Sequence, residues 1–186
     1  MISNYTEYKN YVYQDAVAMG IDPASKKQLL TAHFSNPRWR FIKKLRKVEY
    51  YKNTSRGLLK KLYYLLLWYN YKNYGLKLGF TIPPNVCDAG LSLPHYGTLV
   101  ISKEARLGEN ARIHICVNIG ASKGGAPTIG NNVYIGPGAK IFGPIVIGNN
   151  VKIGANAVVN KSFEDDNITI AGNPAIIVKR HDGKKQ

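Results

Sequence analysis

Aliphatic residues recur at every sixth position along the second half of the chain. The series starts at Ile101 and ends at Val159, and a single four-residue insertion interrupts it between Ile119 and Ile129. Its members are Ile101, Leu107, Ile113, Ile119, Ile129, Ile135, Ile141, Ile147, Ile153 and Val159. A period of six fits neither an α-helix nor an alternating strand, and it indicates an internal repeat.

Each repeat offers a second position for the core. A small or aliphatic residue stands four positions after most of these aliphatic residues, at Ala105, Ala111, Val117, Val133, Ala139, Ile145, Val151 and Ala157. Three repeats would make one triangular coil, and stacked coils would bury the aliphatic residues and pair the backbone groups of successive coils. An antiparallel sandwich is disfavoured, because its strands alternate with period two and vary in length. We therefore predict a mainly β fold, a left-handed parallel β-helix.

The first part of the chain has a helical pattern instead. Ser35, Asn36 and Pro37 resemble a helix start, and apolar residues follow at helical spacing over 37–52. A second helix is expected from about residue 56 to 71, and one or two more before His33. We predict a helical N-terminal domain over 1–78, the β-helix over 79–180 and a flexible basic tail over 181–186.

The positive charge lies mainly in the helical part. The chain has a formal net charge of +15, and residues 1–80 carry 15 Lys/Arg against four Asp/Glu. No zinc finger, RNP-type motif or basic zipper accompanies this charge, so nucleic acid is not expected as a partner. The apolar run over 62–69 is too short to cross a bilayer. Its helix would pack on its own domain or a neighbouring subunit, or dock on an anionic membrane surface through interleaved Lys, Arg and Tyr residues.

The cysteine content and the N-terminal sequence indicate a cytoplasmic protein. Residues 1–15 show no export signal, with contact at the inner face of the membrane as the alternative to a freely soluble state. Cys87 and Cys116 both lie among residues expected to be buried, which favours two reduced core thiols over a disulfide. Two cysteines cannot build a zinc site alone, and no metal is expected.

Several segments resemble the serine acetyltransferase branch of the hexapeptide acyltransferases. The strongest matches are GLSLPHYGTLVIS (90–102), CVNIG (116–120), the repeats over 133–159, and AGNPAIIVKR (171–180). The resemblance covers residues 79–180. It implies transfer of an acetyl group from acetyl-CoA as co-substrate, and a homotrimer whose neighbouring subunits form the groove for the donor.

The resemblance places the catalytic histidine at His95. Acyl transfer to a hydroxyl needs a base near neutral pH, and imidazole has a suitable pKa. His95 also falls on the register of the core residues, six positions before Ile101, unless Leu93 takes the inward place. A hydrogen-bonded structural histidine is the alternative for His95.

The surroundings of His95 are less determined. His114 follows it by one coil plus one residue, so stacking would bring the two side chains close. His114 and Tyr96 are the expected acceptor contacts, with a solvated corner histidine as the alternative for His114. The family supplies a carboxylate about fifteen residues upstream, near Thr81, where this chain has no acid. Asp88 is the nearest candidate, and Glu104 or a backbone carbonyl could orient the ring instead.

The donor contacts implied by the resemblance combine small and basic residues. Small residues would let the pantetheine arm lie against the coil backbone, and basic residues would face the phosphates. The set comprises Gly120, Ala121, Pro137, Gly138, Lys152, Gly154, Ala155, Lys179 and Arg180. A tight turn is the alternative for the GPGA segment, and a solvated lysine is the alternative for Lys152.

Departures from the family pattern bear on the acceptor. Serine acetyltransferases carry Asp immediately before the catalytic histidine, where this chain has Pro94, and the segment 122–130 lacks their Asp-Arg-His group. The shortened, basic, Tyr-rich N-terminal part and the PHYG-type site resemble O-acetyltransferases of surface polysaccharide biosynthesis. We therefore expect a saccharide hydroxyl as acceptor. The alternatives are a serine O-acetyltransferase of cysteine biosynthesis, an amino-sugar N-acetyltransferase and a non-catalytic β-helix scaffold.

Overall fold

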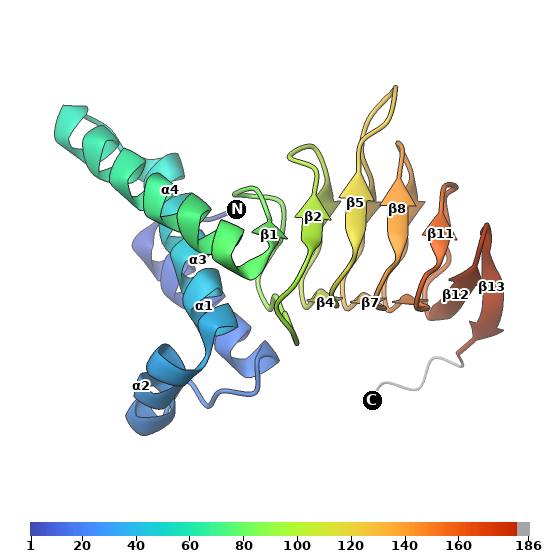
Figure 1. Ribbon diagram of the computed structural model, residues 1–186, viewed down its shortest axis with the longest axis horizontal. Coiled ribbons are helices and arrows are strands. Elements are labelled where there is room, and N and C mark those ends of the chain that lie inside the picture. Colours follow the sequence, from blue (N-terminus) through green and yellow to red (C-terminus); the bar gives the residue numbers. More distant parts are fainter. Residues whose placement is uncertain (182–186) are drawn as a thin grey trace.

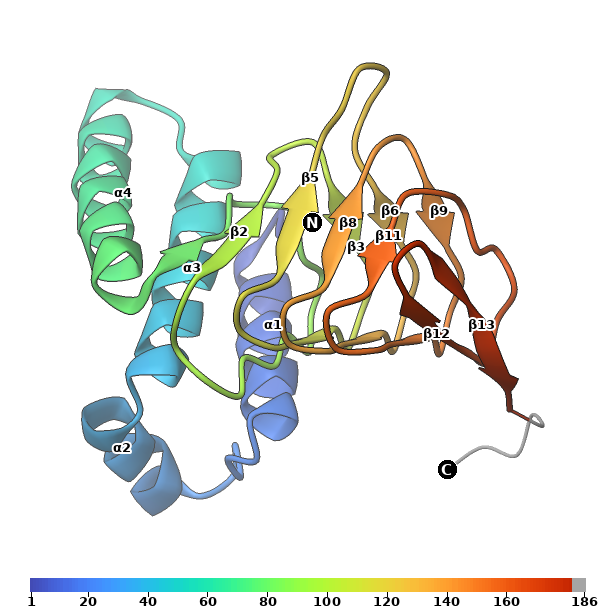
Figure 2. The same ribbon diagram turned by 45° about the vertical axis from the view of Figure 1, so that its right-hand side comes forward.

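Four helices precede the strands in the computed structural model, which describes residues 1–181. They are α1 (Tyr5–Ala18), α2 (Lys26–Ser35), α3 (Pro37–Thr54) and α4 (Leu58–Leu78). Figures 1 and 2 show these helices gathered at one end of the stacked strands. The predicted helical region is confirmed. Of the expected flexible tail over 181–186, only His181 lies within the described residues, and its backbone N–H bonds the carbonyl of Asn167.

The long helices follow their sequence signals, with one difference in length. Helix α3 begins where expected, since the Asn36 side chain accepts a hydrogen bond from the backbone N–H of Trp39 and Pro37 occupies the first turn. Helix α4 continues two turns beyond the expected end at residue 71 and stops at Gly79, whose φ is +78°. The extension forms because Tyr74 and Leu78 pack against the core.

Thirteen short strands follow α4 and build a parallel β-helix. Their bounds are β1 (Phe80–Thr81), β2 (Leu99–Ile101), β3 (Arg106–Leu107), β4 (Arg112–Ile113), β5 (Asn118–Gly120), β6 (Thr128–Ile129), β7 (Tyr134–Ile135), β8 (Lys140–Phe142), β9 (Val146–Ile147), β10 (Lys152–Ile153), β11 (Val158–Val159), β12 (Ile168–Gly172) and β13 (Ala175–Arg180). They form three sheets with the orders β1-β2-β5-β8-β11, β3-β6-β9 and β13-β12-β10-β7-β4. All pairs are parallel except β12 with β13, which close the far end (Figure 1).

The aliphatic series stacks into three inward columns, one for each sheet. Ile101, Ile119, Ile141 and Val159 are in register in the first sheet. All ten members of the series are at most 2% exposed. The predicted repeat and its stacking are confirmed.

The register changes before the first full coil. Ser92 pairs with Arg112, and the next residue, Leu93, is fully buried. Leu93 therefore takes the inward place and leaves His95 exposed on the outside. Of the two alternatives left by the sequence, the structure selects this one.

Asparagines align the coils along one corner. The Asn131 side chain accepts a hydrogen bond from the backbone N–H of Glu109, and the Asn149 side chain accepts one from Asn131, each at 2.8 Å. Asn132 and Asn150 adopt positive φ values of 56° and 55°, as their turn chemistry predicts.

A buried ion cluster lies inside the helical region. The Arg46 guanidinium bonds the carboxylate of Asp15 on α1 at 2.7 Å and that of Glu49 on α3 at 2.9 Å. All three side chains are at most 2% exposed. Burial opposes the charge of Arg46, but the two carboxylates outweigh it and raise its pKa.

The same cluster holds the first coil. Arg46 donates to the carbonyl oxygens of Cys87 and Asp88, and Asp15 accepts from the backbone N–H of Leu91. These bonds satisfy backbone groups of the coil that has no strand neighbour on its helical side. The segment that leads to His95 is thereby fixed by residues of α1 and α3.

The cysteines differ from expectation. Cys87 is buried, and its backbone pairs with that of Leu107 in the next coil. Burial raises the pKa of its thiol to about 12. Cys116 is exposed, because it occupies a corner with a φ of +61° rather than an inward position. The prediction of two core thiols is therefore wrong for Cys116.

We expect the substitution Asp15→Ala to lower the free energy of unfolding by about 3–5 kcal/mol, because it leaves part of a buried guanidinium without its partner. Asp165→Ala is the matched control. It removes an ion pair with Arg180 that is more than half exposed, and should cost at most about 1 kcal/mol. Chemical denaturation of the two variants tests this difference, and equal effects would contradict the role of the cluster.

Candidate functional site

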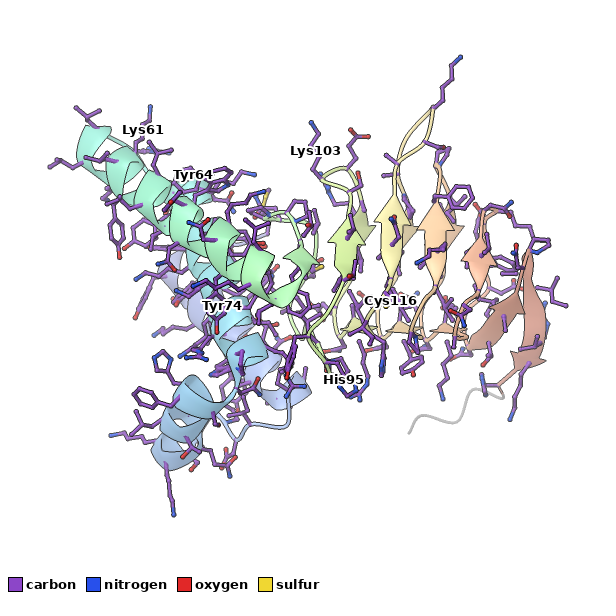
Figure 3. The ribbon with its side chains drawn as sticks, viewed as in Figure 1. Lys61, Tyr64, Tyr74, His95, Lys103 and Cys116 are labelled. Atoms are coloured by element: carbon purple, nitrogen blue, oxygen red, sulfur yellow. The ribbon has the colours of Figure 1, made fainter. Side chains whose placement is uncertain are left out.

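His95 and His114 lie side by side on the outside of the β-helix. Their ring centroids are 5.9 Å apart. His95 lies in the bend after the buried Leu93, and His114 directly follows β4, where its backbone N–H bonds the carbonyl of Ile135 in the next coil. Figure 3 shows His95 at the lower edge of the coils. The spacing of one coil plus one residue brings the two rings together, as predicted.

His114 has features of a ligand-binding side chain. Its Nε2 is buried and has no hydrogen-bond partner among the described residues. Its ring lies 5.1 Å from that of Tyr134. Burial, and then the charges of Arg112 and His95, lower its pKa, so the neutral imidazole dominates near neutral pH. A neutral ring with an unpaired nitrogen is suited to hydrogen-bond a bound molecule.

Asp88 does not meet His95. Its carboxylate accepts a hydrogen bond from the hydroxyl of Tyr11 at 3.0 Å and lies 3.9 Å from the N-terminal amine. Within residues 1–181 the His95 ring makes no hydrogen bond to a carboxylate or a carbonyl. The structure therefore gives the expected orienting carboxylate a different contact. Tyr96, which follows His95, is 65% exposed.

Part of the expected donor set lines the same corner as His114. Pro137 and Gly138 follow β7, and Gly154 and Ala155 follow β10, so they stack in the coils beyond His114. Coil packing itself requires small residues here. A Cβ on Gly136 would lie 2.8 Å from the backbone nitrogen of Ala155. Packing between coils is therefore sufficient to require glycine at position 136.

Gly120 and Ala121 lie at another corner. Gly120 ends β5, which belongs to the first sheet, and pairs with Phe142 of β8, and Ala121 directly follows. In Figure 1 the long loop after β5 extends along the upper edge, opposite the lower edge on which Figure 3 places His95. One chain therefore does not bring Gly120 and Ala121 beside the histidines.

The basic donor residues have unequal surroundings. Lys152 is exposed on β10 and in register with Thr169, which faces Lys179 of β13. Arg180 instead forms an ion pair of 2.9 Å with Asp165. Its predicted role toward a phosphate thus competes with a contact inside the chain.

The sequence interpretation missed two outward residues of the same column. Arg112 and Tyr134 are in register with each other, and Tyr134 is in register with Lys152. Each precedes a core aliphatic residue of the third sheet, as Lys152 precedes Ile153. That shared offset is a signal that could have identified them. No group of three or more His, Cys, Asp or Glu side chains in the described ranges is arranged to hold a metal ion.

Comparison with known proteins identifies the repeat. Residues 126–161 match the bacterial transferase hexapeptide family (six repeats). No match to a curated protein was found.

Solved structures resemble nearly the whole chain. Serine acetyltransferase from Brucella abortus strain S19 is 28% identical, with a TM-score of 0.76 over 97% of this chain and 72% of that chain. The Neisseria gonorrhoeae serine acetyltransferase is 31% identical, with a TM-score of 0.72 over 94% of this chain and 67% of that chain. A complex of the Brucella abortus strain S19 enzyme with coenzyme A is 27% identical, with a TM-score of 0.74 over 95% of this chain and 69% of that chain. The chain thus belongs to the hexapeptide-repeat acyltransferases and has a serine acetyltransferase-like structure.

Proposed function

We propose that this chain is an acetyl-CoA-dependent O-acetyltransferase in which His95 is the general base. The pairing of His95 with the neutral, unpartnered His114 carries the proposal. A complex of a similar structure with coenzyme A supports acetyl-CoA as the donor.

In the proposed reaction, His95 removes the proton of the acceptor hydroxyl while its oxygen attacks the thioester carbonyl. The carbon–oxygen bond forms, the carbon–sulfur bond breaks, and the His95 imidazolium returns the proton to the departing thiolate. His114 holds the acceptor oxygen or the developing oxyanion through its Nε2–H. No redox change occurs and no metal is required.

Serine is the acceptor that the comparisons support better. The similar solved structures compared above are serine acetyltransferases. The saccharide role expected from the sequence therefore lacks support from these relatives. We propose free serine as the first acceptor, with the exposed Arg112 available to pair its carboxylate.

One observation keeps a saccharide hydroxyl as the second candidate. A serine ammonium group needs an anionic partner, and no carboxylate among residues 1–181 bonds either histidine. Pro94 stands beside His95 where an acid is expected. A saccharide hydroxyl is uncharged and needs no anionic partner.

We also propose that the active form is a homotrimer. Gly120 and Ala121 lie at a different corner from His95. A neighbouring copy that presents its β5 corner to the His95 corner would close the donor groove between two subunits. The donor would then contact both copies.

Replacing His95 by Ala should lower the turnover of acetyl transfer by about two to four orders of magnitude, because the hydroxyl must then attack with its proton attached. Acetyl-CoA affinity should stay within about twofold, since the donor contacts lie in other coils. Thiol release and calorimetry measure the two quantities. More than about a tenth of wild-type turnover in a folded variant would assign the proton to another group, with His114→Ala as the next test.

Subunit sharing predicts complementation between two inactive variants. Ala121→Trp should block the donor groove, and His95→Ala should remove the base. Each site takes its His95 corner from one subunit and its Ala121 corner from the neighbour. In randomly mixed trimers, about a quarter of the sites combine two intact corners, so coexpression should restore about a quarter of wild-type activity. Each variant expressed alone, and shown to be trimeric by sedimentation, is the control. If mixed trimers stay inactive, the His95 and Ala121 corners do not come from two different subunits, and the proposal of a shared site is wrong.

The acceptor is decided by thiol release with free serine against oligosaccharides. We expect serine-dependent release that disappears in His95→Ala. Asp22→Ala, on the α1–α2 loop, is the control and should keep it. Release with a saccharide but not with serine would replace the first acceptor by the second, while no release with either would contradict the transferase proposal itself.

A further inference from the structure

Helix α4 presents an uncovered apolar face. Six large apolar residues on one side of it are each 55% to 83% exposed; the first five lie within three turns, and the last follows two turns later. They are Leu58, Leu62, Leu65, Leu66, Tyr69 and Leu76. The opposite face packs on α3 through Leu67 and Tyr71. Isolated exposed leucines are ordinary, but a cluster of them on one side of a helix marks an interaction surface. We refer to these six residues as the α4 stripe.

Lysines border the α4 stripe. Lys61 and Lys72 flank it on one side, Lys77 lies on the other, and all three are exposed. Figure 3 shows Lys61 projecting from the outer end of α4. Residues 37–78 contain 12 Lys/Arg and one acid, Glu49, which is buried against Arg46. The surface around the stripe therefore carries positive charge without acidic partners from α3 or α4.

A pocket continues this surface between α3 and α4. It has a volume of about 330 Å³ and is lined by Lys44, Lys47, Leu66, Leu67 and Asn70. Leu66 belongs to both the pocket and the α4 stripe. Its two leucines and the ammonium groups of Lys44 and Lys47 are suited to a ligand that combines a hydrocarbon chain with a phosphate.

We propose that the α4 stripe docks on an anionic phospholipid bilayer surface, with the bordering lysines at the headgroup level and Lys44 and Lys47 on one lipid phosphate. An apolar stripe bordered by lysines is the pattern of interfacial helices. None of the helices in the described part of the chain is both long and apolar enough to span a bilayer. In the proposed complex α4 lies in the plane of the surface, as amphipathic interfacial helices do.

A second copy of the chain is a poorer occupant of this face. Two α4 stripes in contact would bring their lysine borders together, and like charges oppose that association. Anionic lipid instead neutralises the lysines, and each one near such a surface strengthens binding by several-fold. Charge complementarity thus selects the bilayer.

The test is sedimentation of the full chain with vesicles of phosphatidylcholine mixed with phosphatidylglycerol, without acetyl-CoA. We expect binding that is absent with phosphatidylcholine alone. Leu62→Ser/Leu66→Ser should weaken it at least about tenfold through lost apolar burial. Lys61→Gln/Lys72→Gln should weaken it about thirtyfold at low salt.

Matched variants separate the α4 stripe from general surface effects. Leu30→Ser/Phe34→Ser removes two apolar residues on α2 that have the same spacing and similar exposure, and Lys103→Gln/Lys123→Gln removes two charges on the β-helix. Both should keep wild-type binding. Equal binding to neutral vesicles, equal losses in the matched variants, or a Leu62/Leu66 variant that loses its oligomeric mass without vesicles would each overturn the proposal. The last result would make the face a subunit interface.

Discussion

Each coil of the β-helix depends on the next one for its hydrogen bonds. Strands β1 to β11 are only two or three residues long, and their backbone groups pair mainly with those of neighbouring coils. The two ends therefore need separate solutions. At the far end β12 and β13 fold into an antiparallel pair, and at the near end Arg46 and Asp15 bond the backbone of the first coil. A buried guanidinium thus substitutes for a missing strand.

This arrangement also positions the proposed chemistry. His114 stands one residue outside the inward column, so the register that buries Ile113 turns the histidine outward. His95 follows the segment that the ion cluster bonds. Its ring lies next to that of His114, which belongs to the following coil. The β-helix carries both histidines, and the helical region fixes the backbone that leads to His95.

The repeat could be predicted from the sequence because it rests on spacing alone. The columns of Ile and Val follow from a period of six, and the meeting of His95 with His114 follows from coil length. Features that depend on contacts across the chain could not be predicted in this way. The partner of Asp88 is Tyr11, 77 residues away, and Arg180 pairs with Asp165 across a hairpin.

Two further differences have local causes that periodicity does not record. Cys116 was expected inside the core because its neighbours are apolar, but a corner with positive φ turns it out. The sequence predicts that helix α4 ends near residue 71, whereas packing of Tyr74 and Leu78 against the core extends it to Leu78. Arg112, Tyr134 and Lys152 each directly precede an inward aliphatic residue of the third sheet. This pattern is visible in the sequence when the outward positions of the repeat are compared as well as the inward ones.

The asparagine corner has a consequence for how such a chain can change length over evolution. Asn131 bonds the coil before it and is bonded by Asn149 in the coil after it, and Asp166 takes the same place at the last coil. Each coil therefore supplies a side-chain oxygen that accepts from the coil before it and a backbone N–H that donates to the coil after it. Duplication or loss of a whole coil would therefore leave every remaining junction chemically complete, whereas gain or loss of one residue at this corner would misalign all the coils beyond it. Growth of the molecule is thus restricted to whole coils, and smaller insertions are confined to corners such as the loop after β5 that lie outside the ladder.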